Sequence, residues 1–79
     1  MPTVLRIDGI RVVIYPNDHR PAHVHLIGEG AEALFEIDRD GVVLRENYGF
    51  PAHRLPRLAA ELARRRDVLL SEWNRIHGR

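Results

Sequence analysis

The sequence contains no cysteine among its 79 residues, and this absence limits the kinds of site that it can hold. Without thiols there is no disulfide and no thiolate ligand, so any bound metal must be held by histidine, aspartate or glutamate. Long apolar runs are missing as well, because none approaches the roughly 20 residues of a membrane-spanning helix. The opening stretch, MPTVLRIDG, lacks the charged and apolar regions of a signal peptide. We therefore expect a cytoplasmic protein that does not act at a membrane.

Lysine is also absent, so all 12 basic residues are arginine, and the formal net charge is only +1. So small a net charge does not by itself indicate nucleic-acid binding, although a local cluster of arginines can still bind phosphate. The basic residues are concentrated from Arg45 onward. An arginine bias usually reflects a GC-rich bacterial genome, but arginine also suits phosphate contacts, so nucleic acid stays open as a partner.

The length predicts one domain, over residues 1–79, with a small hydrophobic core. Hydrophobic residues make up 44% of the chain and charged residues 29%, which is typical of a folded protein rather than a disordered one. Small cores are often completed by self-association, so a homodimer is expected.

The first half of the chain predicts five antiparallel strands joined by tight turns. Three dipeptides carry the turn signals between β-branched or alternating segments, namely Asp8-Gly9, Glu29-Gly30 and Asp40-Gly41. With Asp8-Gly9 as a two-residue loop, Ile7 pairs with Ile10, and one face of this hairpin is apolar throughout. The resulting meander runs to about Glu46.

The second half predicts a helix. Its apolar residues recur at spacings of three, four and seven, and they are Leu55, Leu58, Ala59, Leu62, Leu69, Trp73 and Ile76. Pro56 suits a first helical turn and Gly78 a helix end. The run ARRRD interrupts the apolar stripe, which leaves either one long helix or two shorter ones joined near Arg66-Asp67. The predicted fold class is therefore α+β, an antiparallel β-meander of about five strands with the C-terminal helix packed on one face.

Three of the five histidines lie within seven residues, in the stretch NDHRPAHVH. His19 falls in the loop before the third predicted strand. His23 and His25 occupy alternate positions of that strand, so their side chains share one face.

Strand register brings carboxylates to this pair of histidines. A Glu29-Gly30 loop places His23 directly across from Glu36, with Glu36 and Glu32 as the diagonal neighbours of His25. In the next hairpin, an Asp40-Gly41 loop would pair Glu36 with Arg45 and so extend the polar patch.

Three interpretations of this patch remain open. The polar residues can simply be the wet face of a half-exposed sheet. They can form a metal site for a divalent transition metal such as zinc, or they can perform acid-base chemistry with arginines that hold a phosphate. The candidate metal-binding and catalytic residues are His19, His23, His25 and Glu36, and the candidate phosphate-binding residues are Arg20 and Arg45.

The chain as a whole resembles the bacterial domain of unknown function 4160 family. Its members typically begin with MPT and carry a motif of the form ndH.PpHfH, matched here by Asn17, Asp18, His19, Pro21, His23 and His25. A second segment is matched by Gly28, Glu32, Ala33, Phe35, Glu36 and Ile37. A leucine-rich helix with a tryptophan near its end follows in the family, as Trp73 does here.

The resemblance implies no particular reaction. Genes of this family often lie beside another small gene of unknown function, an arrangement similar to toxin-antitoxin pairs. We therefore expect a component of such a two-gene system, with the product of the neighbouring gene as its partner and the histidine patch as its metal-binding or acid-base site. The alternative is a non-catalytic module that binds a protein partner or nucleic acid, with structural histidines.

Overall fold

The computed structural model describes residues 3–78, so Met1 and Pro2 of the opening MPT and the terminal Arg79 lie outside the described residues. Five strands come first, and their bounds are β1 (Thr3–Ile7), β2 (Ile10–Val13), β3 (His23–Gly28), β4 (Ala31–Asp38) and β5 (Gly41–Tyr48). Three helical segments follow, η1 (Ala52–Arg54), α1 (Leu55–Arg64) and α2 (Arg66–His77). The predicted α+β class is confirmed, and the C-terminal helix is split in two.

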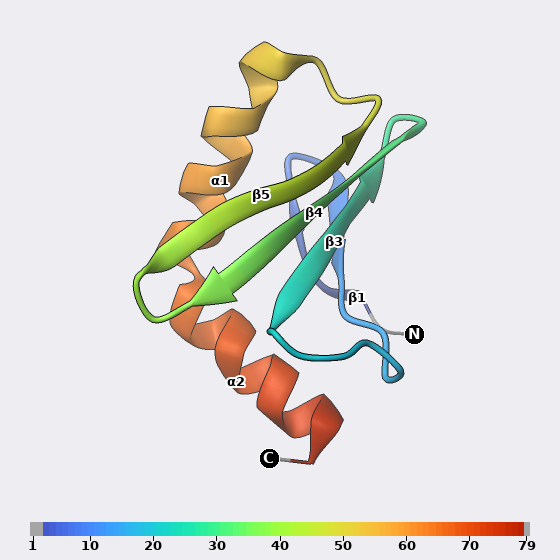
Figure 1. Ribbon diagram of the computed structural model, residues 1–79. Helices are drawn as coiled ribbons and strands as arrows, with labels where there is room; N and C mark the ends of the chain where they lie inside the picture. Colours follow the sequence, from blue (N-terminus) through green and yellow to red (C-terminus); the bar gives the residue numbers. More distant parts are fainter. Residues whose placement is uncertain (1–2, 79) are drawn as a thin grey trace.

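The strands form one antiparallel sheet in chain order, β1-β2-β3-β4-β5. Both helices lie across one face of this sheet, as Figure 1 shows. The first and second turns follow the prediction, because Asp8 and Glu29 have positive φ, as do the glycines that follow them. Two consecutive positive φ angles are the requirement of a type I′ hairpin turn, whose twist matches that of the strands. The predicted partners, Ile7 with Ile10 and His23 with Glu36, are therefore found.

The third turn differs from the prediction by one residue. Its loop is Arg39-Asp40, and Asp38 pairs with Gly41. The side chain of Asp38 explains the difference, since its Oδ1 accepts the backbone N–H of Asp40 at 2.7 Å and that of Gly41 at 2.9 Å. An aspartate that bonds the backbone two and three residues onward closes a turn by itself.

This shift of the turn by one residue changes the partner of Glu36. Val43, not Arg45, lies directly across from Glu36, and a bulge between Leu34 and Phe35 then shifts the register along β5. Arg45 is left on the diagonal, where its Nε is still 3.3 Å from a carboxylate oxygen of Glu36. The predicted contact exists, but the predicted direct pairing was wrong.

The core lies between the sheet and the helices. Both strand and helix residues contribute side chains that are at most 1% exposed, including Val12, Val24, Leu26, Phe35, Leu58, Leu62, Leu69 and Trp73. Helix α1 begins one residue before Pro56, Arg65 separates it from α2, and α2 ends where Gly78 adopts a left-handed conformation with φ of 75°. No helix within residues 3–78 has the length and apolarity needed to cross a membrane.

The burial pattern predicts which helix positions contribute most to the free energy of unfolding. Leu62→Ala, at a fully buried position of α1, should lower the free energy of unfolding by about 2–5 kcal/mol, because it removes core contacts and leaves a cavity. Val68→Ala is the matched control, since Val68 is 54% exposed on α2, and its effect should stay within about 0.5 kcal/mol. Urea unfolding followed by circular dichroism measures both values. Equal effects would contradict this assignment of the core.

Candidate functional site

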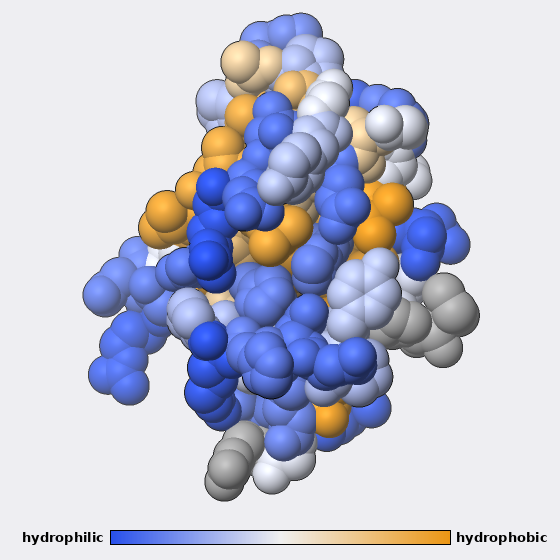
Figure 2. Space-filling view, turned by 45° about the vertical axis from the view of Figure 1, so that its right-hand side comes forward, coloured by the Kyte–Doolittle hydropathy of each residue, from blue (hydrophilic) through white to orange (hydrophobic). Residues whose placement is uncertain are grey.

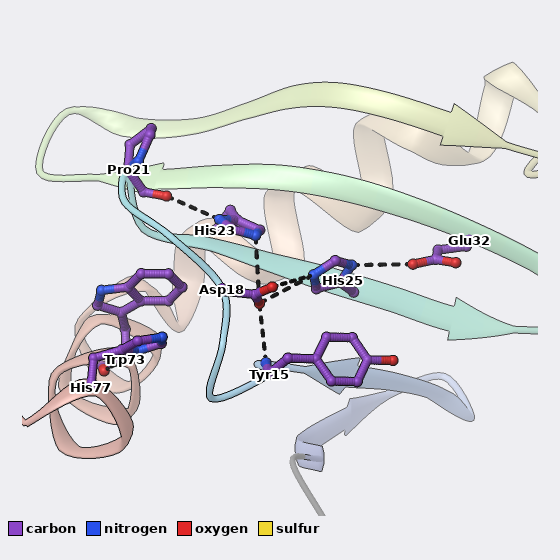
Figure 3. A network of polar contacts seen from close by, with 8 residues as sticks. All are labelled: Tyr15, Asp18, Pro21, His23, His25, Glu32, Trp73 and His77. Atoms are coloured by element: carbon purple, nitrogen blue, oxygen red, sulfur yellow. Dashed lines mark hydrogen bonds and ion pairs between the residues drawn. The ribbon is translucent and has the colours of Figure 1, made fainter.

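The candidate site lies on the face of the sheet that does not carry Val24 and Leu26. His23 and His25 project there from β3, because alternate residues of a strand share one face. The loop between β2 and β3 passes over this face and brings Asp18 between the two histidines (Figure 3). Strand alternation and one loop thus assemble three side chains that bind metals or protons.

Asp18 is the centre of the arrangement. Its Oδ2 lies 3.2 Å from His25 Nε2 and 3.5 Å from His23 Nε2, and its Oδ1 lies 3.4 Å from His25 Nε2. The backbone N–H of Tyr15 donates to the same Oδ2 at 3.1 Å, and the N–H of Asp18 donates to the Tyr15 carbonyl at 3.0 Å. These two bonds within the loop fix the carboxylate in place before any ligand binds.

The second nitrogen of each ring also has a partner. His23 Nδ1 lies 3.0 Å from the carbonyl oxygen of Pro21, and His25 Nδ1 lies 3.1 Å from Oε2 of Glu32. Both imidazoles are therefore held at one nitrogen by an oxygen atom, with the other nitrogen directed at Asp18 (Figure 3).

Aromatic rings surround the three side chains. The Tyr15 ring meets His25 edge-on with centroids 4.9 Å apart, and the Trp73 ring lies 5.3 Å from that of His23. On its other side Trp73 stacks on His77, with centroids 3.9 Å apart and an interplanar angle of 25°. The side chains of His23, His25 and Asp18 are only 9%, 12% and 15% exposed, so solvent weakens their mutual electrostatic interactions little.

The residues predicted as a site are only partly brought together. His23 and His25 are adjacent, with ring centroids 5.2 Å apart. Glu36 turns instead toward Arg45, and His19 is exposed. Arg20 is exposed on the loop as well. Within residues 3–78, the group of metal-binding side chains that converges here is Asp18, His23 and His25, with donor atoms all within 4.8 Å of one another.

Sequence reasoning missed the roles of Asp18 and Glu32. Asp18 precedes His19 in the same motif and is a possible ligand by residue type. The sequence pattern does not predict, however, that the loop between β2 and β3 folds back over β3. Glu32 was recognised as one of two diagonal neighbours of His25. The structure selects Glu32, because the carboxylate of Glu36, the other diagonal neighbour, pairs with Arg45.

Negative charge extends from the site toward β5. Tyr48 lies across from Glu32, and the pKa of Tyr48 is raised, chiefly because its hydroxyl donates a 2.9 Å hydrogen bond to Glu46. The charge of Glu46 raises this pKa further, and the charge of Glu32 adds a smaller contribution. Glu32, which also contacts His25, and Glu46 therefore lie near Tyr48 at this end of the face.

Chemically, the cluster can do two things. Two imidazoles and a carboxylate are the donor set of many zinc and iron sites. The same groups can also pass a proton between an imidazole and a carboxylate. Both uses need the two Nε2 atoms that face Asp18.

The amino-acid sequence matches the family described as "Domain of unknown function (DUF4160)" over residues 9–74 of the 79-residue chain. This match covers all of the candidate site. Searches among curated proteins and among solved structures gave no significant match. On the strength of the family match, the chain belongs to the DUF4160 family.

Proposed function

We propose that this protein binds one divalent transition-metal ion through Asp18, His23 and His25. The observation that carries the proposal is the convergence of three electron-rich atoms, His23 Nε2, His25 Nε2 and Asp18 Oδ2, in a largely buried place. Zinc, iron, cobalt and nickel all accept imidazole and carboxylate ligands.

The ring nitrogen that carries the proton in each histidine determines what can lie between the imidazoles and Asp18. A carbonyl oxygen can only accept a hydrogen bond, so the 3.0 Å contact to Pro21 places the proton of neutral His23 on Nδ1. The Nε2 atom of His23 then carries a lone pair and faces a carboxylate oxygen, which is repulsive unless a cation lies between them. His25 repeats the pattern when its Nδ1–H donates to Glu32.

The distances suit a metal ion. Ligand atoms bound tetrahedrally at about 2.0–2.2 Å from zinc are about 3.3 Å apart. Asp18 Oδ2 lies 3.2 Å from His25 Nε2 and 3.5 Å from His23 Nε2, which matches that edge length. The donor atoms of all three residues lie within 4.8 Å of one another.

The outer contacts follow the usual architecture of metal sites. A ligating histidine generally donates its second N–H to a carboxylate or a backbone carbonyl, which fixes the ring and raises its basicity. His25 has the carboxylate of Glu32 and His23 has the carbonyl of Pro21 in these roles. This pairing supports metal binding more than a plain polar surface, which does not require both rings to be oriented.

Acid-base chemistry is the competing use of the same groups. Protons alone satisfy both imidazoles only when each Nε2 carries its own proton, which makes both rings cationic beside one carboxylate. One metal ion satisfies both at once, and we therefore favour it.

The biological setting that we propose is the two-gene, toxin-antitoxin-like system implied by the family resemblance. Its support is that resemblance alone.

The first prediction concerns metal binding. Wild-type protein should bind about one Zn²⁺ or Co²⁺ per chain in isothermal titration calorimetry, because residues 3–78 bring one such donor group together. Asp18→Asn keeps the shape of the side chain but removes its charge, and it should weaken binding by more than about 100-fold, as should His25→Ala. Glu32→Gln, which only orients His25, should weaken binding by about 10–100-fold.

Glu36→Gln is the matched control for Glu32→Gln, since both carboxylates project from β4 and only Glu32 contacts a histidine of the cluster. Its affinity for metal should equal that of wild type. Undiminished binding by Asp18→Asn and His25→Ala, with folding intact by circular dichroism, would refute the proposal.

The second prediction concerns the tautomer of His23. In metal-free protein at a pH where the ring is neutral, nitrogen-15 NMR should show the proton of His23 on Nδ1, because Pro21 accepts it. His53 is exposed and provides the reference, with the proton mainly on Nε2 as in free histidine. A His23 proton on Nε2 would mean that Asp18 accepts it, and the acid-base alternative would then be preferred.

A further inference from the structure

The number of donor side chains at the site is three. Within the described residues, the group that lies close enough to share an ion consists of Asp18, His23 and His25. Structural zinc sites are closed by four protein ligands, whereas three protein ligands leave at least one position for water or substrate. Other first-row metals accept up to six ligands, which leaves more positions free.

His19 is the natural candidate for a fourth protein ligand, because it follows Asp18 in the chain. Its side chain is exposed, whereas the three converging side chains are at most 15% exposed. Glu32 is already engaged with His25 Nδ1 on the side of the ring away from Asp18 (Figure 3). Neither residue closes the site in this arrangement.

Charge and surroundings then select the kind of ligand. A divalent ion bound by one carboxylate and two neutral imidazoles keeps a net positive charge, so an anion is favoured over a neutral molecule. The three side chains are at most 15% exposed and are flanked by the rings of Tyr15 and Trp73, so a small ligand is favoured over a large one. On the face drawn in Figure 2, hydrophilic residues cover most of the surface, and the hydrophobic residues gather mainly along its left edge, with smaller groups in the centre and at the right.

We infer that the metal centre is coordinatively open and binds a small anion directly, in exchange with water. This inference rests on the proposed metal binding. It adds that one coordination position of the ion is not occupied by the protein and is free to bind an exogenous ligand. An open position of this kind is what metal-dependent hydrolysis or activation of a small molecule requires.

The test uses full-length protein loaded with Co²⁺ in place of the native ion, with azide as the small anion. Visible absorption of cobalt reports its coordination. Titration with azide should change the spectrum of wild-type protein until one azide is bound per cobalt. His19→Ala should show the same azide affinity within about twofold, because His19 does not occupy the open position.

Three results would overturn the inference, and they differ in what they imply. A cobalt spectrum that does not respond to azide means a closed site, while the proposed metal binding stands. A response in His19→Ala but not in wild type means that His19 is the fourth ligand, again with metal binding intact. Failure of wild type to bind Co²⁺ at all removes the proposed function together with this inference.

Discussion

The register between β3 and β4 is the constraint on which the rest of the molecule depends. In this pair of strands, Val24 faces Phe35 and Leu26 faces Ala33 across the core side, while His23 faces Glu36 on the other side. A slip of one residue would turn every side chain of β3 to the opposite face. The histidines would then enter the core and the apolar residues would enter solvent. The type I′ turn at Glu29 and Gly30 prevents this slip, because its geometry fixes which residues pair.

The loop between β2 and β3 adds what the sheet alone cannot supply. A flat polar face would hold His23 and His25 side by side, with water around both rings. The loop covers them with Asp18, whose carboxylate is tied to the backbone of Tyr15. The side chains of His23 and His25 are therefore only 9% and 12% exposed, and each imidazole interacts with the carboxylate of Asp18. Such groups need a proton or a metal ion between them, because burial removes the water that would otherwise separate them.

Local patterns were enough to predict most of the fold. Two of three hairpin turns, the pairing of β3 with β4 and the apolar stripe of the helices follow from turn residues and periodicity. The third turn was predicted one residue too far along the chain, because the side chain of Asp38 favours a different loop from the Asp40-Gly41 signal. This effect depends on a side-chain hydrogen bond, which the periodicity of the sequence does not predict. The candidate site was half predicted for a related reason. Strand alternation identifies His23 and His25, but the path of an irregular loop decides that Asp18, and not His19, reaches them.

The stack of rings at the end of α2 gives the site an optical signal of its own. Trp73 is the single tryptophan of the chain and is 1% exposed. Its indole touches His23 on one side and lies against His77 on the other, in the last turn of the helix. Because His23 also faces Asp18, the fluorophore is one ring away from any ion bound there. Ions with unpaired electrons, such as cobalt or nickel, would quench the fluorescence of Trp73, whereas zinc would not. The wavelength and intensity of this emission would therefore report both the occupancy of the site and the kind of ion bound there.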